Sequence, residues 1–260
     1  MNETDPRRSD ENGIERFETT RNRRAFLTTA AAAIGAATLG PGIFLLTFGN
    51  GAVAAGEGVR RASAQVRWGL LIDATLCRSD CDACVLACHQ ENGLPLPQSA
   101  ADVRWIRKVT LRDPKSGAER SLPAMCMHCA HPPCVDVCPT GASFRRADGI
   151  VLVNRHTCIG CRYCVMACPY KARNFVHAPV TTQKPEVPRG MGCAEGCTLC
   201  VHRVDRGERP ACVEACPSGA LLFGNLNDPQ SEIAQRVREL NARPLRSDLK
   251  LDPGVRVHGV

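Results

Sequence analysis

Cysteine constrains this sequence more than any other residue type. The chain has 17 cysteines in 260 residues, against two Trp, two Tyr and seven Phe. All but Cys193 fall into four groups: Cys77, Cys81, Cys84 and Cys88; Cys126, Cys129, Cys134 and Cys138; Cys158, Cys161, Cys164 and Cys168; and Cys197, Cys200, Cys212 and Cys216. Because aromatic side chains are scarce, something else must organise the interior. Bound metal clusters would do so, since ligand bonds formed only in the folded state contribute folding free energy.

The third cysteine group has the spacing of a bacterial [4Fe–4S] ligand run. From Cys158 to Pro169 it reads Cys-x2-Cys-x2-Cys-x3-Cys-Pro. In such a run three thiolates wrap one cubane cluster, and the last cysteine serves the other cluster of a pair. Proline then turns the chain away, because it cannot extend a helix into the cluster. The pattern predicts four [4Fe–4S] clusters whose iron is bound by the sixteen grouped cysteines.

Structural zinc and disulfide bonds are the competing interpretations of these cysteines. Zinc sites close locally on two Cys-x2-Cys pairs, and three close thiols followed by a distant Cys-Pro do not suit one tetrahedral ion. Disulfides are disfavoured by the odd number of cysteines and by the crowding within each run. A metal-stabilised scaffold with no redox role is the reading that bound zinc would favour.

Two of the four groups depart from the regular spacing. In the first, three residues at 78–80 separate Cys77 from Cys81, and His89 follows Cys88 where proline is usual. In the fourth, eleven residues lie between the second and third cysteines. The ligand loop of the first group must therefore be one residue wider, and a longer loop interrupts the fourth.

Other residues near the cysteines receive structural interpretations. Cys193 is read as a spare thiol, with a substitute ligand as the alternative. We expect four histidines to pack or hydrogen-bond around the clusters and not to bind iron: His89, His128, His131 and His156. Trp68 and Trp105 are expected to be core residues.

The ligand groups are embedded in a repeated pattern. Residues 70–73 and 151–154 precede the first and third groups at the same distance, and each predicts a short strand. Asp148-Gly149 predicts a hairpin turn between residues 144–146 and 150–153. A second hairpin is expected between Val103–Leu111 and Arg120–Leu122. The repeat predicts an α+β fold of duplicated bacterial-ferredoxin-like units, each holding two clusters, with short strands, small helices and long cluster-binding loops.

The C-terminal part contains one clear amphipathic pattern. Residues 231–240 place Ile233, Val237 and Leu240 on one face, which predicts a helix capped by Asp228 or Ser231. The tail from residue 243 to 260 is expected to be irregular. The predicted organisation is a signal and linker at 1–64, a four-cluster domain at 65–226 that pairs 77–88 with 193–216 and keeps 126–168 as its own pair, and a helix with a tail at 227–260.

The N-terminal segment predicts export. Arg23-Arg24-Ala25-Phe26-Leu27-Thr28 leads into an uncharged stretch, Ala30–Phe48, in the layout of a twin-arginine signal. An uncleaved membrane anchor is the alternative, but the Ala, Gly and Pro content makes this stretch only mildly hydrophobic. Cleavage could follow Ala54 or Ala64. Such a signal carries folded proteins, so clusters inserted in the reducing cytoplasm would arrive protected in an oxidising compartment.

The basic excess of the chain does not indicate nucleic acid. The formal net charge is +7 without cofactors. An oxidised [4Fe–4S] cluster with four thiolates carries about −2, so four of them would cancel this excess. We therefore interpret the basic residues as internal compensation.

The cysteine motifs resemble those of the four-cluster iron–sulfur subunits of the dimethyl sulfoxide reductase type, over residues 66–228. The motifs are His128-Cys129-Ala-His-Pro-Pro-Cys134-Val-Asp-Val-Cys138-Pro-Thr-Gly-Ala, Asp148-Gly-Ile-Val, Cys158-Ile-Gly-Cys161 and Pro210-Ala-Cys212-Val-Glu-Ala-Cys216-Pro. Within that family the widened first group, Ala87-Cys88-His89 and Gly224-Asn-Leu-Asn-Asp-Pro resemble DsrO subunits of the Dsr sulfur-metabolism membrane complex. Tetrathionate reductase beta subunits share several of these features.

This resemblance implies a cross-paired set of ligands. One cluster would use Cys77, Cys81, Cys84 and Cys216, and its neighbour Cys88, Cys197, Cys200 and Cys212. A third would use Cys126, Cys129, Cys134 and Cys168, and the fourth Cys138, Cys158, Cys161 and Cys164. The four centres would form a row along which electrons hop, with burial, hydrogen bonds to sulfur and nearby charge setting each potential.

The resemblance also implies partners instead of a substrate. The chain would be an electron-transfer subunit without a catalytic site of its own. It would act in the periplasm, associated with the membrane through its partners, between a polytopic quinone-interacting subunit of the NrfD type and a cytochrome or molybdopterin partner in sulfur metabolism. The alternative is the beta subunit of a molybdopterin oxidoreductase such as a tetrathionate or thiosulfate reductase. No nucleic-acid partner is expected.

Overall fold

The computed structural model describes residues 36–38, 44–46, 60–99 and 102–260. It separates into two units, residues 1–55 and 56–260. In the first, β1 (Ala36–Thr38) pairs antiparallel with β2 (Phe44–Leu46), both within the apolar stretch discussed above. The twin-arginine motif lies outside the described residues. Within the described ranges, no helix has the length and apolar character needed to cross a bilayer.

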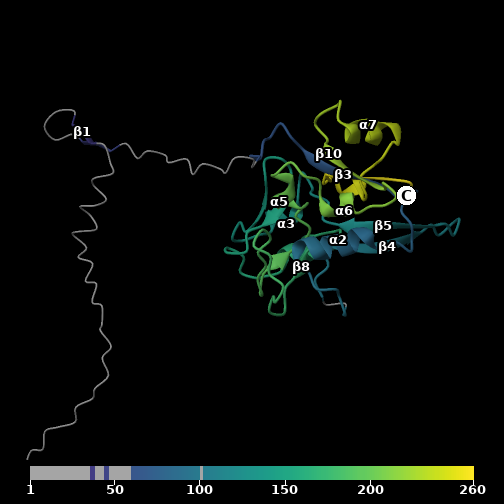
Figure 1. Cartoon of the computed structure of the whole chain (residues 1–260), viewed down its shortest axis with the longest axis horizontal. Coiled ribbons are helices and arrows are strands. Elements are labelled where there is room, and N and C mark those ends of the chain that lie inside the picture. Colours follow the sequence, from purple (N-terminus) through teal and green to yellow (C-terminus); the bar gives the residue numbers. More distant parts are fainter. Residues whose placement is uncertain (1–35, 39–43, 47–59, 100–101) are drawn as a thin grey trace, which may run out of the picture. The chain divides into compact units, whose positions relative to one another are not determined.

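A three-stranded sheet forms the centre of the second unit (Figure 1). Its middle strand, β3 (Trp68–Asp73), pairs antiparallel with β10 (Leu221–Asn225) and parallel with β11 (Val255–His258). Both β3 neighbours come from the far end of the chain, so the sheet closes the domain around the loops between them. Gly69 is required here, because a Cβ at this position would lie 2.5 Å from the carbonyl oxygen of Gly254.

The strand β11 corrects one expectation from the sequence. The tail was predicted to be irregular, and that prediction is wrong for residues 255–258. Val255 and Val257 point into the core and are almost fully buried, while Arg256 and His258 alternate with them on the other side. The segment before β11 is fixed by Arg67, whose guanidinium donates to the Asp252 carboxylate at 2.5 Å.

Two hairpins flank the cysteine loops as the sequence predicted. The hairpin β4 (Ile106–Arg112) and β5 (Glu119–Met125) lies between the first two groups, and β6 (Ser143–Arg145) pairs with β7 (Val151–Val153) around Asp148-Gly149. A shorter antiparallel pair, β8 (Asn174–Phe175) and β9 (Ala194–Glu195), follows the third group. These pairs anchor the start and end of the ligand loops.

The helices are short because each follows a ligand loop. They are α2 (Ala83–Asn92), α3 (Pro133–Asp136), α4 (Tyr163–Ala167), α5 (Val201–Val204) and α6 (Ala211–Glu214), with a 3₁₀ turn at Ser247–Leu249. Each α-helix contains or directly follows a cysteine. The expected class, α+β with short strands, small helices and long cysteine-bearing loops, is confirmed.

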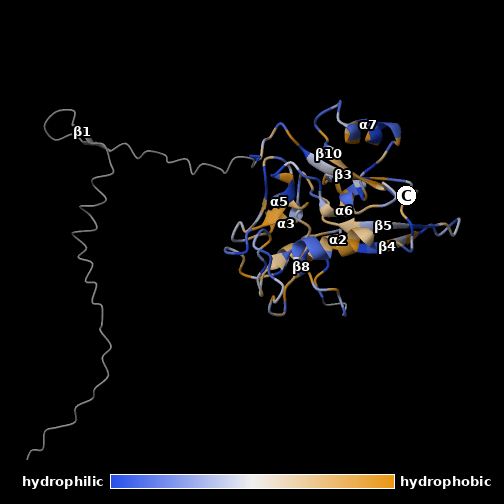
Figure 2. Cartoon of the chain, in the orientation of Figure 1, coloured by the Kyte–Doolittle hydropathy of each residue, from blue (hydrophilic) through white to orange (hydrophobic). Residues whose placement is uncertain are grey.

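The predicted C-terminal helix is present as α7 (Glu232–Glu239), packed against β10 and β3 (Figure 1). Ser231 caps it by accepting a hydrogen bond from the Ala234 N–H at 3.3 Å. Figure 2 shows hydrophobic and hydrophilic residues alternating along this helix. Its apolar face buries Ile233 against Leu71, which covers the side of the sheet that faces away from the main core.

The main core surrounds the cysteines. It combines strand residues such as Leu70 and Ile72 with Trp105, Met125 and several of the grouped cysteines in one cluster of buried side chains. Trp105 is almost fully buried, as expected. Trp68 is half-buried and stacks on Phe223 with ring centroids 5.0 Å apart.

Candidate iron–sulfur centres

Three compact cavities in the second unit are each lined by four cysteines. The first middle site contains Cys88, Cys197, Cys200 and Cys212. The second middle site contains Cys126, Cys129, Cys134 and Cys168. The second end site contains Cys138, Cys158, Cys161 and Cys164. In each site the thiols come from two different cysteine groups, as a pair of clusters that exchange ligands requires.

The four remaining grouped cysteines form the first end site: Cys77, Cys81, Cys84 and Cys216. Their proximity is visible in their mutual electrostatics. Burial raises the pKa of Cys77, Lys108 lowers it, and the thiols of Cys216 and Cys81 raise it further. Burial, Cys77 and Cys216 together raise the pKa of Cys84 to about 11.

A left-handed residue shapes three of the four ligand loops. It precedes the second cysteine of each Cys-x2-Cys pair, as His128 (φ 44°), Gly160 (φ 71°) and Leu199 (φ 55°). Such a turn directs successive backbone N–H groups to the concave side of the loop, where an anion is stabilised. The wider loop of the first group has no positive φ at Asp80, so its extra residue replaces this turn.

Backbone hydrogen bonds reach sulfurs in both middle sites and in the second end site. The N–H of Ser143 donates to Cys138 Sγ (3.3 Å), that of Ala172 to Cys168 Sγ (3.5 Å) and that of Leu199 to Cys197 Sγ (3.4 Å). These bonds favour the thiolate form that binds iron. At Cys138, burial raises the pKa, but bonds from Ser143 and Thr140 outweigh it and lower the pKa.

The two middle sites are buried, and the two end sites are partly exposed. All eight thiols of the middle sites are buried. In the end sites only Cys84 and Cys164 are buried, and Cys161 is the one fully exposed member. Burial, followed by neighbouring thiols, raises the pKa of Cys129 to about 12 and that of Cys197 well above its usual value. Iron must therefore displace protons from these thiols when it binds.

Contacts between the sites place them in a row. After burial and Cys200, the thiol of Cys84 raises the pKa of Cys212, which joins the first end site to the first middle site. Cys126 lies near enough to affect Cys197, which joins the two middle sites. Cys134 affects Cys164 in the same way and joins the second middle site to the second end site. The end sites are thus the two termini of the row.

Comparison with known proteins agrees with this arrangement. A family model described as a 4Fe-4S dicluster domain matches residues 119–226. The iron–sulfur subunit 1 of an Hdr-like menaquinol oxidoreductase from Archaeoglobus fulgidus is 42% identical over 265 residues, covering 90% of this chain and 96% of the relative. NrfC of Escherichia coli is 45% identical over 176 residues, 67% of this chain and 72% of the relative. The chain belongs to this family of [4Fe–4S] electron-transfer subunits.

A tetrathionate reductase subunit of Salmonella typhimurium is a further member, 40% identical over 177 residues, which are 68% of this chain and 65% of the relative. The family relationship confirms [4Fe–4S] clusters as the cofactor and the dimethyl sulfoxide reductase type as the family. The chain is therefore an electron-transfer subunit of a membrane-associated oxidoreductase. Which cysteines bind which cluster stays a prediction, and the four sites supply sixteen thiols in four sets of four for it.

A buried arginine tests whether these sites suit an anionic cofactor. Arg173 is 5% exposed, and its Nη2 lies 3.6 Å from Cys134 Sγ. Burial lowers the pKa of this guanidinium, but the thiolates of Cys126 and Cys134 outweigh burial and raise the pKa. A buried cation is strongly destabilising without a negative partner. The family's cofactor, with about −2 charges per cluster, provides that partner, so the residues present fit it.

Other metal and sulfur chemistry is limited by the same geometry. None of the 17 cysteines forms a disulfide. In the described part of the chain, no three His, Cys, Asp or Glu side chains converge closely enough to hold a single ion. A zinc ion draws all its ligands to one atom, whereas each of the four irons of a cubane takes one thiolate.

The histidines and the seventeenth cysteine occupy positions around the sites. His128 is buried and accepts a hydrogen bond from the Val151 N–H through Nδ1 (3.1 Å). Burial, with Arg173, lowers its pKa to about 3, so the ring stays neutral. His89 is also buried, with Nδ1 2.8 Å from the Pro95 carbonyl oxygen. The thiol of Cys193 donates to the Arg155 carbonyl oxygen (3.4 Å).

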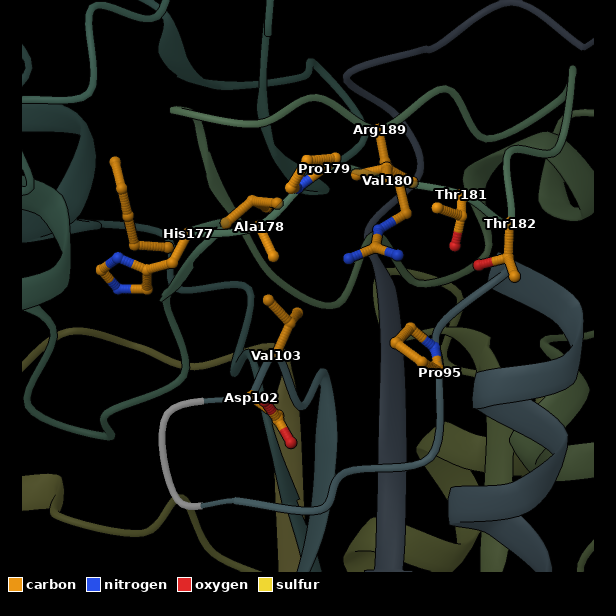
Figure 3. A pocket seen from close by; sticks show the side chains of 12 residues that line it. Pro95, Asp102, Val103, His177, Ala178, Pro179, Val180, Thr181, Thr182 and Arg189 are labelled. Atoms are coloured by element: carbon orange, nitrogen blue, oxygen red, sulfur yellow. The ribbon is translucent and has the colours of Figure 1, made fainter.

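A separate groove contains no cysteine in its lining (Figure 3). Figure 3 shows Pro95 and Val103 facing Pro179 and Val180 across it, so its wall is mainly apolar. The buried cation at its edge, Arg189, is neutralised by Glu195 at 2.7 Å. This ion pair was missed by sequence reasoning, and so was Arg173, because neither arginine lies in a motif.

Proposed function

We propose that this chain is the exported subunit that relays electrons through four [4Fe–4S] clusters, between a quinone-interacting membrane subunit and a second redox protein, in a complex of the DsrO type. The first and second end sites and the two middle sites would each bind one cluster with the cysteines that define them. The chain would contribute no substrate site.

The observation that carries this proposal is the extent of the Archaeoglobus fulgidus match. It covers 90% of this chain, whereas the NrfC match covers 67%. The name of that relative couples an Hdr-like complex to menaquinol oxidation. A quinol donor and an Hdr-like partner are the arrangement expected for a DsrO-type subunit.

The chemistry of the relay requires little from the protein besides position. The clusters, when bound, accept and release single electrons. The chain fixes four thiol sites in a row, shields the middle two from water and leaves the end two partly open. Electrons would enter at one end site and leave at the other.

The second end site has the surface that a redox partner needs. Around the exposed Cys161, three apolar residues are themselves exposed: Ile159 by 68%, Tyr163 by 54% and Met166 by 64%. Residues 149–185 contain no Asp or Glu, while Arg162 and Lys171 are exposed there. Apolar contact with a basic rim suits a redox protein with an acidic docking face.

Purification of the complex from native membranes tests the proposal. We expect the chain to co-purify with a polytopic membrane subunit and a haem or Hdr-like partner. Paramagnetic resonance should show four centres that a menaquinol analogue reduces. Fewer than four centres in anaerobic material, or no reduction by the quinol, would contradict it.

A molybdopterin oxidoreductase is the second candidate, favoured by the 40% identity to the tetrathionate reductase subunit. Metal analysis of the same complex separates the two, because only this candidate predicts stoichiometric molybdenum and reduction of tetrathionate or thiosulfate.

The export part of the proposal has its own test. Replacing the pair with Arg23→Lys and Arg24→Lys should leave the chain in the cytoplasm with its clusters inserted, because a twin-arginine route requires the arginines. Protease treatment of spheroplasts reports the location. Digestion of the variant as readily as the unmodified chain would contradict export by this route.

A further inference from the structure

The guanidinium of Arg173 connects two of the four sites. Its Nη2 donates to Cys134 Sγ of the second middle site (3.6 Å) and to the Ser143 hydroxyl (3.2 Å). The Ser143 N–H in turn donates to Cys138 Sγ of the second end site (3.3 Å). One cation therefore touches a thiol of one site directly and a thiol of the next site through a single serine.

Among the described residues, no carboxylate pairs with this cation. The groups that act on its charge are thiols of the two adjacent sites, Cys126, Cys134 and Cys164. Its Nε has no hydrogen-bond partner in the same part of the chain. By contrast, the equally buried Arg189 is paired with the Glu195 carboxylate. The positive charge of Arg173 therefore acts on whatever charge these two sites hold.

The groups beside the other two sites are of a different kind. At the first middle site the side-chain donor is the neutral amide of Asn92, 3.6 Å from Cys88 Sγ. At the first end site the nearby cation is Lys108, whose ammonium donates to the Cys81 carbonyl oxygen (2.7 Å) near the surface. Water screens a partly exposed charge much more than a buried one.

We infer that Arg173 is a positioning residue for the electron itself: its fixed charge raises the reduction potentials of the clusters at the second middle and second end sites. Reduction adds one electron to a cluster, with no bond broken and no proton required. The added negative charge is stabilised by a cation in a poorly screened position. An electron passing from the first middle site to the second middle site therefore moves to a site of higher potential.

Redox titration of the whole complex, followed by paramagnetic resonance, tests this inference with Arg173→Met. The signals are first assigned with Cys161→Ser, which removes or converts the centre at the second end site. At a fixed ambient potential, the reduced-to-oxidised ratio of the two neighbouring clusters should fall about tenfold, equivalent to about 59 mV for one electron. The other two clusters should not move. Four unmoved potentials, or four that shift alike, would overturn the inference.

Two further variants separate charge from structure. Arg173→Lys keeps the charge and loses the planar fork, so it should retain most of the potential that Arg173→Met loses. A Lys variant that behaves like Met, or that lacks the clusters, would assign a structural role instead. Lys108→Met is the matched control and should affect only the first end site.

The inference rests on the ligand sets proposed above, and its failure is distinguishable from theirs. If the unmodified complex lacks four centres, the ligand sets fail. If it has four centres whose potentials ignore residue 173, only this inference fails.

Discussion

The middle sites and the end sites are built from the same kind of ligand loop but lie in different surroundings. All eight thiols of the middle sites are buried, and most of those of the end sites are partly open. The loops alone cannot produce this difference, because left-handed residues shape the second, third and fourth groups alike. The difference comes from what covers them: the hairpin β4–β5, Trp105 and the β3 sheet enclose the middle of the row. Local sequence thus makes a ligand site, and tertiary packing decides whether it conducts electrons internally or exchanges them with a partner.

The largest contrast should appear when one ligand is removed from each kind of site. Cys197→Ser removes a thiol of the first middle site, deep in the main core. Because ligand bonds contribute folding free energy, we expect loss of more than one cluster and failure of cooperative folding. Cys161→Ser removes the exposed thiol of the second end site and should convert or delete one centre, disturb its neighbour and leave the fold intact. Iron content per chain and thermal unfolding measure both; equal losses would break the comparison.

The wall of the first middle site provides the next largest effect. Trp105 lines that site and donates through Nε1 to Glu195 (3.2 Å), which also pairs with Arg189. Glu195→Gln would leave the Arg189 cation buried without a partner, at a cost of about 3–5 kcal/mol. Denaturant unfolding of the cluster-loaded protein measures this. The double change Glu195→Leu with Arg189→Met should recover much of the loss, and a double variant as unstable as the single one would contradict the explanation.

Oxidative damage should follow the same order of exposure. Mild ferricyanide treatment should destroy the two end-site clusters several times faster than the two middle-site clusters, because oxidant reaches open sulfurs first. Paramagnetic resonance spectra taken over time report each centre. Simultaneous loss of all four signals would show that burial gives the middle sites no protection.

A smaller effect is expected from the surface of the second end site. Met166→Glu places an acid on this basic, exposed surface and should slow electron exchange with an acidic partner about tenfold at low salt, with unchanged cluster spectra. Stopped-flow reduction measures the rate. Leu111→Glu, on the exposed part of the β4–β5 hairpin, is the matched control and should leave the rate unchanged. Equal effects of the two substitutions would argue against docking at this end.

No change is expected when the extra thiol is replaced. Cys193 contacts the Arg155 carbonyl oxygen, and its thiol also lies near Cys158 of the second end site. A serine hydroxyl can make the same hydrogen bond, so Cys193→Ser should retain all four spectra. Loss of a centre would mean that the ligand set of the second end site is wrong.

The sequence was most informative where structure depends on short range. The Cys-x2-Cys spacings placed the ligand loops, and Asp148-Gly149 located the turn between β6 and β7, because both features are decided by a few adjacent residues. Ser231 was one of two predicted caps, and it begins α7. Sequence alone could not show the burial difference between sites, because it arises from elements far apart in the chain.

The strand β11 and Arg173 were missed for different reasons. The alternation Val255-Arg256-Val257-His258 was a readable period-two signal, overlooked because the segment is short and follows an irregular stretch. Arg173 gave no signal at all. Its burial depends on Cys134 and Ser143, which precede it by 39 and 30 positions.

The parallel pairing of β11 with β3 also has a consequence for biosynthesis. β3 is made early, yet one of its two edges is covered only by residues 255–258. That edge stays open, with unpaired N–H and C=O groups, until the ribosome has released almost the whole polypeptide. A translation product that stops short of Val255 would expose this edge permanently, so completion of the central sheet reports that synthesis has finished.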